Sequence, residues 1–468
     1  MSMRRRPREK QPDLWIATSD LARTPGHVFY DRLNAVLAEA KFDELVEKRC
    51  RPLYADGVGR PSIPPGVYMR MLLVGFFEGL DSERGIAWRC ADSLSLRQFL
   101  GFSLSEQTPE HSSLSRIRQR LSVEIHQEVF TLVLKVLAEK GLLRGRTIGI
   151  DATTLEANAA LRSIVRRDDG TNYQDFLTSL AKESGIKTPT REDLAKLDKN
   201  RPKKGSNDDW TNPHDPDAKI TKMKDGRTHL AHKAEHAVDM ESGAVLAVTV
   251  QDATLGDTAT MKGTIEATVN NVLDVHRDPR VGHKLSERGL TEWVADKGYH
   301  SNETMELVAG CGMRSYVSEP RRPRRHWSGK ELAKKGTYAN RRRLVTKRGR
   351  MLMRRRGELN ERSFAHCLET GGMRRVHLRG HPNILKRYLI HVAGFNLSLA
   401  MRQLLGVGTP RGLSGRFAAL LASLFGLVIA LGRELDLRAR FERALHILTP
   451  GHTLTSSAAP RTTFSTGC

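Results

Sequence analysis

Residues 147–153 read Thr-Ile-Gly-Ile-Asp-Ala-Thr, a short apolar run that reaches a carboxylate at Asp151. β-Branched residues favour a strand, whereas Asp is depleted in strands, so this Asp needs a reason. One interpretation is structural, because an Asp side chain can accept hydrogen bonds from the turn that follows. The other is a carboxylate held on a rigid sheet to bind a metal ion. This stretch alone leaves both interpretations open.

A second run of the same form closes on Asp296, since residues 292–296 read Glu-Trp-Val-Ala-Asp. Between the two runs, residues 232–250 contain two β-prone segments joined by a Gly-containing turn, which predicts a hairpin. Residues 258–273 have helical spacing, and residues 315–317 are a candidate last strand. Strand, hairpin, helix and strand in this order predict an α/β fold whose sheet mixes antiparallel and parallel strands.

Helical spacing of apolar residues dominates the chain from about residue 28 to residue 140. Within this region, residues 112–121 place Arg116, Arg118 and Arg120 around an amphipathic segment. Such a segment is a candidate DNA-reading helix in a helix-turn-helix arrangement. It is equally the solvated basic face of an ordinary helical bundle, and no turn spacing here separates the two interpretations.

The length of 468 residues predicts several domains. We divide the chain into a disordered basic N-terminus, an all-helical DNA-binding domain, an α/β domain with further helices, and a C-terminal helix with a disordered tail. The boundaries are 1–27, 28–140, 141–405 and 406–468, with insertions in the α/β domain at about 162–227 and 320–356. Residues 417–431 are almost wholly apolar but shorter than a membrane span, so we expect a buried helix there.

Charge is the strongest compositional signal: 76 Lys and Arg against 53 Asp and Glu give a net charge of +23. Such an excess repels itself unless a polyanion is near, so nucleic acid is the expected partner. The alternative is a cationic protein that lies on anionic lipid or is merely kept soluble by its charge. The cations cluster in residues 320–356, where Glu331 is the only acid, and we expect this segment to contact phosphates. The candidate contacts are Arg321, Arg322, Arg324, Arg325, Arg341, Arg342 and Arg343.

Several classes of protein are disfavoured by the sequence. The five cysteines form no Cys-x-x-Cys pair, which argues against a disulfide framework and a zinc knuckle and fits the cytoplasm. No apolar signal-peptide core follows the N-terminal arginines. No Gly-rich phosphate loop supports ATP-driven chemistry. Strand alternation puts His229 on the opposite face from His232 and His236, which disfavours a zinc site.

Two strand-end aspartates and a Glu on a helix beyond the last strand are what a two-metal phosphoryl-transfer site requires. Mg²⁺ prefers oxygen ligands and retains water molecules, so three acids suffice without His or Cys. Glu358 and Glu361 both lie in a segment of helical periodicity at residues 358–366, and both are candidates for the third acid.

These residues resemble the DDE transposases of bacterial insertion sequences, in the branch with a Glu-Arg-x-Phe helix. The resemblance is carried by Ile-Gly-Ile-Asp-Ala-Thr at 148–153, Asp-Lys-Gly-Tyr at 296–299 and Glu-Arg-Ser-Phe at 361–364. It extends to residues 232–239 with the hairpin, to Gly-Gly-Met-Arg-Arg at 371–375, and to the helical region from about residue 60 to 121, so it covers most of the chain.

The resemblance implies a ribonuclease H-like mixed sheet flanked by helices, with Asp151, Asp296 and Glu361 as the catalytic acids that bind Mg²⁺, or Mn²⁺ in its place. It implies a nucleoid-associated enzyme that cleaves the terminal inverted repeats of its element and joins them to double-stranded target DNA, as a homodimer on paired ends. Lys297 and Arg362 would then contact phosphates or balance charge. Related branches carry a Tyr, an Arg and a Lys at fixed spacings around the Glu, and that full set is missing here, which keeps Glu358 as a rival.

Two alternatives from other classes stay open. One is a DNA-binding protein without catalysis, such as a regulator or the product of a decayed element. The other is a plain metal-dependent nuclease. The sequences of the element ends and of the target lie beyond what the residues specify.

Overall fold

The described part of the chain is built around a six-stranded mixed sheet with β1 (Thr147–Glu156), the strand of Asp151, at its centre. The computed structural model describes residues 17, 21–55, 62–201, 205–223, 226–321, 323 and 325–415. Contacts divide the chain into residues 1–413 and residues 414–468, and only 414 and 415 of the second unit are described. The helix expected at 417–431, the tail behind it and most of the expected disordered N-terminus lie outside the described residues.

The sheet mixes antiparallel and parallel pairing, as predicted. On one side of β1 a hairpin pairs antiparallel, and on the other side two strands run parallel to it. The hairpin consists of β5 (Thr228–Asp239) and β6 (Val245–Asp252), and the parallel strands are β7 (Glu292–Ala295) and β8 (Arg314–Val317). A short strand, β4 (Lys219–Lys222), extends the edge of β5. The order across the sheet is β4-β5-β1-β7-β8, with β6 also paired to β5.

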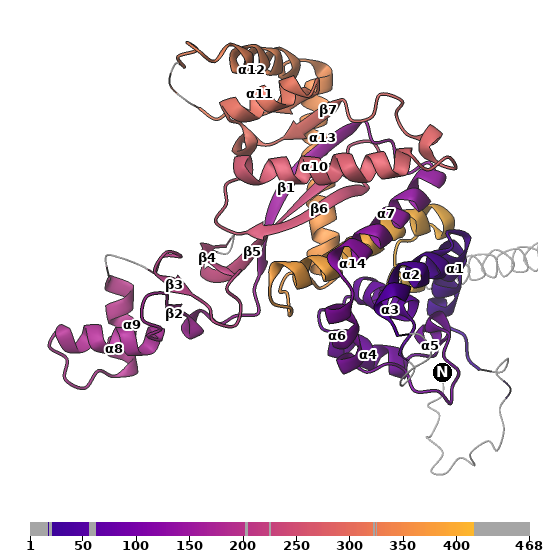
Figure 1. Ribbon diagram of the computed structural model, residues 1–468, viewed down its shortest axis with the longest axis horizontal. Helices are drawn as coiled ribbons and strands as arrows, with labels where there is room; N and C mark the ends of the chain where they lie inside the picture. The colour runs from indigo at the N-terminus through magenta and orange to yellow at the C-terminus, as the bar shows by residue number, and fades with distance from the viewer. Residues whose placement is uncertain are drawn as a thin grey trace, which may run out of the picture. The chain divides into compact units, whose positions relative to one another are not determined.

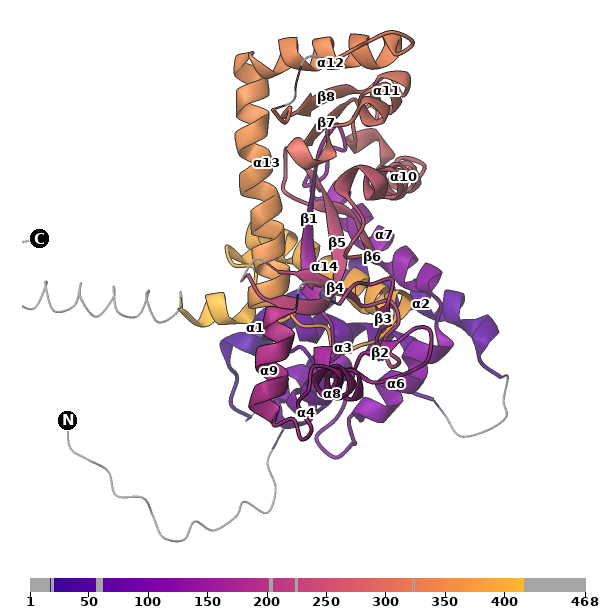
Figure 2. The same ribbon diagram turned by 90° about the vertical axis from the view of Figure 1, so that its left-hand side faces the viewer.

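Helices cover both faces of the sheet, and Ile148 and Ile150, which share the face of β1 opposite to Asp151, are fully buried. Figure 2 shows α10 on one side of the strands and α13 on the other. The helix bounds are α10 (Asp257–His276), α11 (Asn302–Gly310), α12 (Glu331–Leu344), α13 (Lys347–Ala365) and α14 (His381–Leu405), with a π-helical turn at His366–Thr370. The basic residues 320–356 are therefore largely helical.

The first part of the chain is helical, as predicted, and its described residues from 21 to 139 contain no strand (Figure 1). The helices are α1 (Pro25–Glu39), α2 (Phe42–Cys50), α3 (Pro65–Glu78), α4 (Glu83–Asp92), α5 (Leu94–Leu100), α6 (His111–Arg120) and α7 (Val123–Glu139). Helix α1 starts three residues before the expected boundary at 28, because Pro25 fits the first helical position. Of all helices in the described residues, none combines the length and apolarity needed to cross a membrane.

The polar insertion after β1 folds around a small core of its own. It contains the helices α8 (Tyr173–Glu183) and α9 (Arg191–Asn200) beside the two-residue strands β2 (Val165–Arg166) and β3 (Trp210–Thr211). The Trp210 ring contacts Tyr173 and Phe176 with centroids 5.1 and 5.2 Å apart. The insertion ends earlier than residue 227, because β4 belongs to the main sheet.

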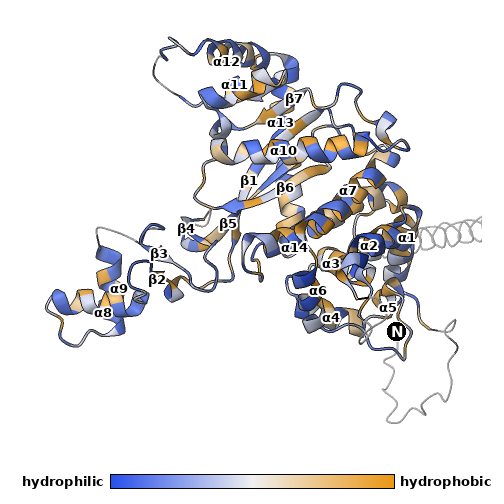
Figure 3. Cartoon of the chain, viewed as in Figure 1, coloured by the Kyte–Doolittle hydropathy of each residue, from blue (hydrophilic) through white to orange (hydrophobic). Residues whose placement is uncertain are grey.

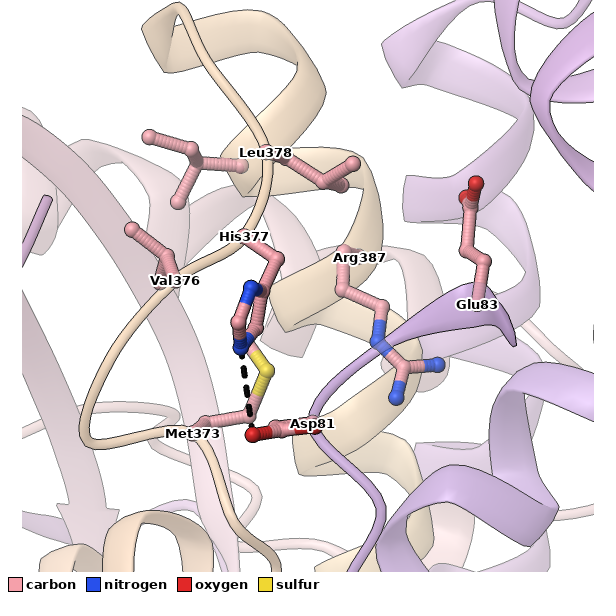
Figure 4. A pocket seen from close by; sticks show the side chains of 8 residues that line it. Asp81, Glu83, Met373, Val376, His377, Leu378 and Arg387 are labelled. Carbon is pink, nitrogen blue, oxygen red and sulfur yellow. Dashed lines mark hydrogen bonds and ion pairs between the residues drawn. The ribbon is translucent and has the colours of Figure 1, made fainter. Parts of the chain in front are cut away.

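Helix α14 joins the N-terminal helices to the sheet through a buried arginine. Arg387 is 4% exposed and donates from Nη1 to Leu72 O and from Nη2 to Leu80 O, each at 3.1 Å. Burial lowers the pKa of Arg387 to about 10. Figure 4 shows its guanidinium pointing to the loop that carries Asp81 and Glu83, beside a cavity of about 20 Å³. That volume holds about one water molecule, so the joint is tightly packed.

Replacing Arg387 with Met tests this joint. The change removes both hydrogen bonds, and the half-buried Leu80 O loses its donor, whereas Leu72 O keeps the hydrogen bond of its own helix; we expect a cost of roughly 1–3 kcal/mol. We expect the melting temperature, followed by circular dichroism, to fall by several degrees. The control is Arg379→Met at an exposed position nearby; equal melting temperatures of the two variants would show that the buried contacts do not stabilise the joint.

Candidate active site

Asp151 and Asp296 lie at the same level of neighbouring strands. The expectation that the first strand ends on Asp151 is wrong, because β1 continues to Glu156, whereas Asp296 directly follows the last residue of β7. Gly149 of β1 is paired with Val294 of β7 in parallel register, and two residues further along each strand reaches its Asp. Alternation along the strands directs both side chains to the same face of the sheet. Burial raises the pKa of Asp151, the Arg356 guanidinium lowers it, and the charge of Asp296 raises it again. The structure thus brings Asp151 and Asp296 together.

Each of these carboxylates also accepts a hydrogen bond from a backbone N–H close behind it in the sequence, within strand β1 for Asp151 and in the following turn for Asp296. Asp151 Oδ1 accepts from the Ala152 N–H at 2.9 Å, and Asp296 Oδ1 accepts from the Gly298 N–H at 2.8 Å. The interpretation of Asp151 as the cap of a following turn is therefore wrong, whereas Asp296 does cap the turn at Lys297–Tyr299. These hydrogen bonds occupy one oxygen of each residue and leave Oδ2 for another partner.

The residue of α13 that faces Asp151 is an arginine. Residues 356, 360 and 363 share the helix face that lies on the sheet, because they are spaced by one and two turns. Arg356 Nη1 donates to Asp151 Oδ2 at 2.8 Å, and Asn360 Nδ2 donates to Gly149 O at 3.2 Å. The Ser363 hydroxyl lies 2.9 Å from His236 Nδ1 on β5.

Neither candidate for the third acid lies with the aspartate pair in this structure. Glu361 is one residue beyond Asn360, which turns its side chain about 100° away from the sheet-facing side. It is exposed, and it has no ion pair within the described residues. Glu358 is also exposed and pairs with Arg362 one turn later at 2.5 Å. Within the described residues no three His, Cys, Asp or Glu side chains come together as a metal site, so the three-acid cluster expected from the sequence is not assembled.

The aspartate pair by itself fits Mg²⁺. Both residues supply hard carboxylate oxygens, and Mg²⁺ in proteins commonly uses one or two carboxylates together with water and substrate phosphates. Asp296 Oδ2 receives no hydrogen bond from the described residues, whereas Asp151 Oδ2 is engaged by Arg356. A metal ion at Asp151 would compete with this guanidinium.

A buried polar network on the opposite face of the sheet anchors the loop of Asp296, and sequence reasoning missed it. Glu235 of β5 is fully buried and accepts from the Tyr299 hydroxyl at 3.1 Å. Lys233, two residues earlier on the same face, donates to Asp257 at 2.7 Å. Gly298 lies against the Asp257 carboxylate, where a Cβ atom would collide with it. The signal was available, since Lys233 and Glu235 are charged residues at alternate positions of a predicted strand.

Some of the residues expected to bind DNA have no protein partner for their charge, and others already form ion pairs or ring contacts within the described residues. Arg116, Lys297, Arg321 and Arg342 are exposed and form no ion pair with the described residues. Arg322 and Arg324 lie outside the described residues. The Arg120 guanidinium stacks over the Tyr54 ring at 4.6 Å.

The other expected phosphate contacts have protein partners, which corrects the expectation that the basic segment lacks counter-charges. The acids come from outside that segment in the sequence. Arg325 and Arg341 both pair with Glu319, at 2.9 and 2.7 Å, and Arg348 pairs with Glu292. Likewise Arg118 pairs with Glu83, Arg343 donates to Ser315 O, and Arg362 pairs with Glu358.

Gly149 allows α13 to lie close to β1. A Cβ atom at this position would lie 2.8 Å from Asn360 Oδ1 and against Met240. We expect Gly149→Ala to push α13 from the sheet and to cost roughly 1–3 kcal/mol of stability, read as a lower melting temperature. Gly263→Ala, on a helix with open space around it, should be neutral or stabilising. Equal effects of the two changes would contradict the close contact.

One comparison with known proteins bears on this site. Residues 19–120 match the family model described as "Transposase domain (DUF772)". The match spans helices α1 to α6 and supports a transposase-family protein. A search of curated proteins finds no match to this sequence.

Proposed function

We propose that the protein is a DDE-type DNA transposase, which cleaves the ends of its element and joins them to target DNA. The observation that carries this proposal is the placement of Asp151 and Asp296 side by side on neighbouring parallel strands. It occurs in a chain whose residues 19–120 match a transposase domain. Neither feature alone would separate a transposase from other metal-dependent enzymes.

The connectivity of the sheet supports the ribonuclease H-like part of the proposal. Strand β1 and the hairpin of β5 and β6 pair antiparallel, and the last two strands, β7 and β8, run parallel to β1 on its other side. Helix α13 follows the last strand and crosses the face that holds both aspartates. That is the helix expected to supply the third acid.

Mg²⁺ bound at this place would activate an oxygen nucleophile and stabilise the oxygen that leaves the phosphate. Asp151 and Asp296 would hold the ion, and Lys297, exposed beside Asp296, would contact a neighbouring phosphate. Glu361 is the acid of α13 without a pairing partner in the described residues, so it is the better third ligand than Glu358. Its entry requires α13 to move and the Arg356–Asp151 pair to break.

One observation favours a second candidate function. Arg356 neutralises Asp151, and no third acid lies beside the aspartate pair among the described residues. A DNA-binding protein without catalysis would have these same features. We therefore retain the regulator or decayed transposase as the rival.

The deciding experiment incubates the full chain with Mg²⁺ and duplexes that carry the inverted repeats flanking its gene. Cleavage followed by strand joining to a second duplex is the expected result. Binding without cleavage would overturn the proposal in favour of the regulator. Cleavage without joining would favour a nuclease.

Arg356 should set the pH dependence of the reaction. Its guanidinium lowers the pKa of Asp151 against the effect of burial, and Asp151 must be ionised to bind the metal. Arg356→Gln removes the lowering contribution, so the pKa rises and the acid limb of Mg²⁺-dependent cleavage moves to higher pH. Arg356→Lys should shift it less, because it keeps the charge. A pH profile unchanged in Arg356→Gln would contradict this role.

A further inference from the structure

A groove of about 500 Å³ lies at the amino ends of the parallel strands, at the opposite end of β7 from Asp296. β7 is four residues long, so the groove begins about 13 Å from Asp296 along this strand. It belongs to neither the aspartate pair nor the buried network around Glu235. Three of its lining residues are arginines: Arg146, Arg288 and Arg314.

Three separate segments of the chain bring these arginines together, and backbone hydrogen bonds tie the segments to one another. The Thr291 N–H donates to Arg146 O at 2.9 Å, and the Arg314 N–H donates to Thr291 O at 2.8 Å. The loop of Arg288 is held by the Ser286 N–H, which donates to Arg144 O at 2.9 Å. The arginines therefore extend from a fixed frame.

The positive charge of the groove is not neutralised by its acids. Arg146, Arg288 and Arg314 are exposed and form no ion pair with the described residues. Glu292, at the floor, is 1% exposed and already binds Arg348, the Thr147 hydroxyl and the Tyr316 hydroxyl. The other acid of the lining, Glu287, is exposed, and its single negative charge stands against the positive charges of three arginines.

Further cations continue the surface towards the corner between α12 and α13. The charges of Arg314 and Arg342 both lower the pKa of Arg343, which places the three guanidinium groups near one another. Burial is the larger cause of that lowering. Arg342 is exposed and unpaired within the described residues, so it extends the row of free cations beyond Arg314.

We propose that this groove, with Arg146, Arg288 and Arg314, binds the phosphate backbone of duplex DNA at a second contact surface, away from the aspartate pair. The proposal rests on the proposed function only in taking DNA as the polyanion. Arginines match phosphate geometry through paired N–H donors. The groove has no aromatic lining residue on which an unpaired base could stack, which favours duplex over single-stranded DNA.

The test measures affinity for a random-sequence 30-base-pair duplex without divalent metal, so that no cleavage enters the readout. The variant carries Arg146→Gln, Arg288→Gln and Arg314→Gln. The matched control carries Arg162→Gln, Arg191→Gln and Arg379→Gln, at exposed arginines without ion pairs in the described residues. A third protein has Lys at the three groove positions, which keeps the charge.

We expect the groove variant to bind at least about tenfold more weakly at near-physiological salt, with the slope of log affinity against log salt reduced by roughly 2–3. The control triple should lose less than about threefold, and the Lys variant should retain most of the affinity. Wild-type affinity and slope in the folded Gln variant would overturn the proposal. An equal loss in the control triple would also overturn it, because net charge alone would then explain the effect.

The outcome is independent of catalysis. If the full chain binds DNA through the groove but never cleaves it, the groove proposal is upheld and the transposase proposal fails. If the full chain cleaves DNA while the groove variant binds it normally, the transposase proposal is upheld and the groove proposal fails.

Discussion

Asp151→Asn and Asp296→Asn should each lower Mg²⁺-dependent cleavage of element ends at least about 10³-fold. The amide keeps the size of the side chain and the acceptor for the Ala152 or Gly298 N–H. It removes the charge that a divalent cation needs. Measured by the release of a labelled strand, the loss should appear in the rate, while the affinity for DNA stays within about twofold of wild type.

The matched control is Asp274→Asn, an exposed carboxylate on α10. It removes one negative charge from the protein without touching the site, and its cleavage rate should equal that of wild type. Cleavage by either aspartate variant at the control rate would remove that residue from the metal site. A drop in DNA binding equal to the drop in cleavage would point to a folding defect, which a melting curve would reveal.

Glu361→Gln should lower cleavage at least about 10²-fold, although the structure turns Glu361 away from the sheet-facing side of α13. Of the two acidic candidates on this helix, it is the one without a pairing partner in the described residues, whereas Glu358 is engaged by Arg362. The expected loss rests on Glu361 joining the aspartates once DNA and Mg²⁺ displace Arg356. Cleavage kinetics at saturating DNA measure it.

Glu358→Gln is the matched comparison on the same exposed side of α13, and we expect a much smaller loss. If Glu358→Gln is the more damaging change, the third acid is Glu358. If both variants cleave normally, no acid of α13 takes part, and the aspartate pair acts with other ligands.

The strands and their carboxylates were predictable because their signals are local. A β-branched run that closes on Asp needs few residues to be recognised, and two such runs flanking a hairpin define a mixed sheet. Because β1 and β7 pair in parallel register, Asp151 and Asp296 lie at the same height in the sheet. The resemblance of residues 148–153 and 296–299 to known motifs pointed to the same positions.

The residue of α13 that faces Asp151 was not predictable, because the inner side of this helix mixes apolar and polar residues. Leu352, Leu359 and Phe364 are buried together with Asn360 and Ser363, so apolar spacing locates the inner side but does not show that Arg356, and no acid, faces Asp151. Arg356 reaches Asp151 across 205 residues of sequence. Which acid faces the pair is thus a tertiary property.

Counter-charges for the basic segment were missed for the same reason. Glu292 and Glu319 neutralise Arg348, Arg325 and Arg341 from strand ends outside the segment. Arg321 and Arg342 of the segment form no ion pair with the described residues, and neither do the three groove arginines, which come from separate parts of the sequence. Clustering in the sequence therefore overstated the free charge of the segment and did not indicate the groove.

The central claim is that Asp151 and Asp296 together hold a divalent ion, and iron-directed backbone cleavage tests it most directly. Fe²⁺ takes the place of Mg²⁺ and, with ascorbate and peroxide, cuts the polypeptide beside its ligands. We predict cuts next to residues 151 and 296, suppressed by excess Mg²⁺ and lost in the double variant Asp151→Asn, Asp296→Asn. Cuts confined to other places, or cuts at these two places that persist in the double variant, would contradict the claim.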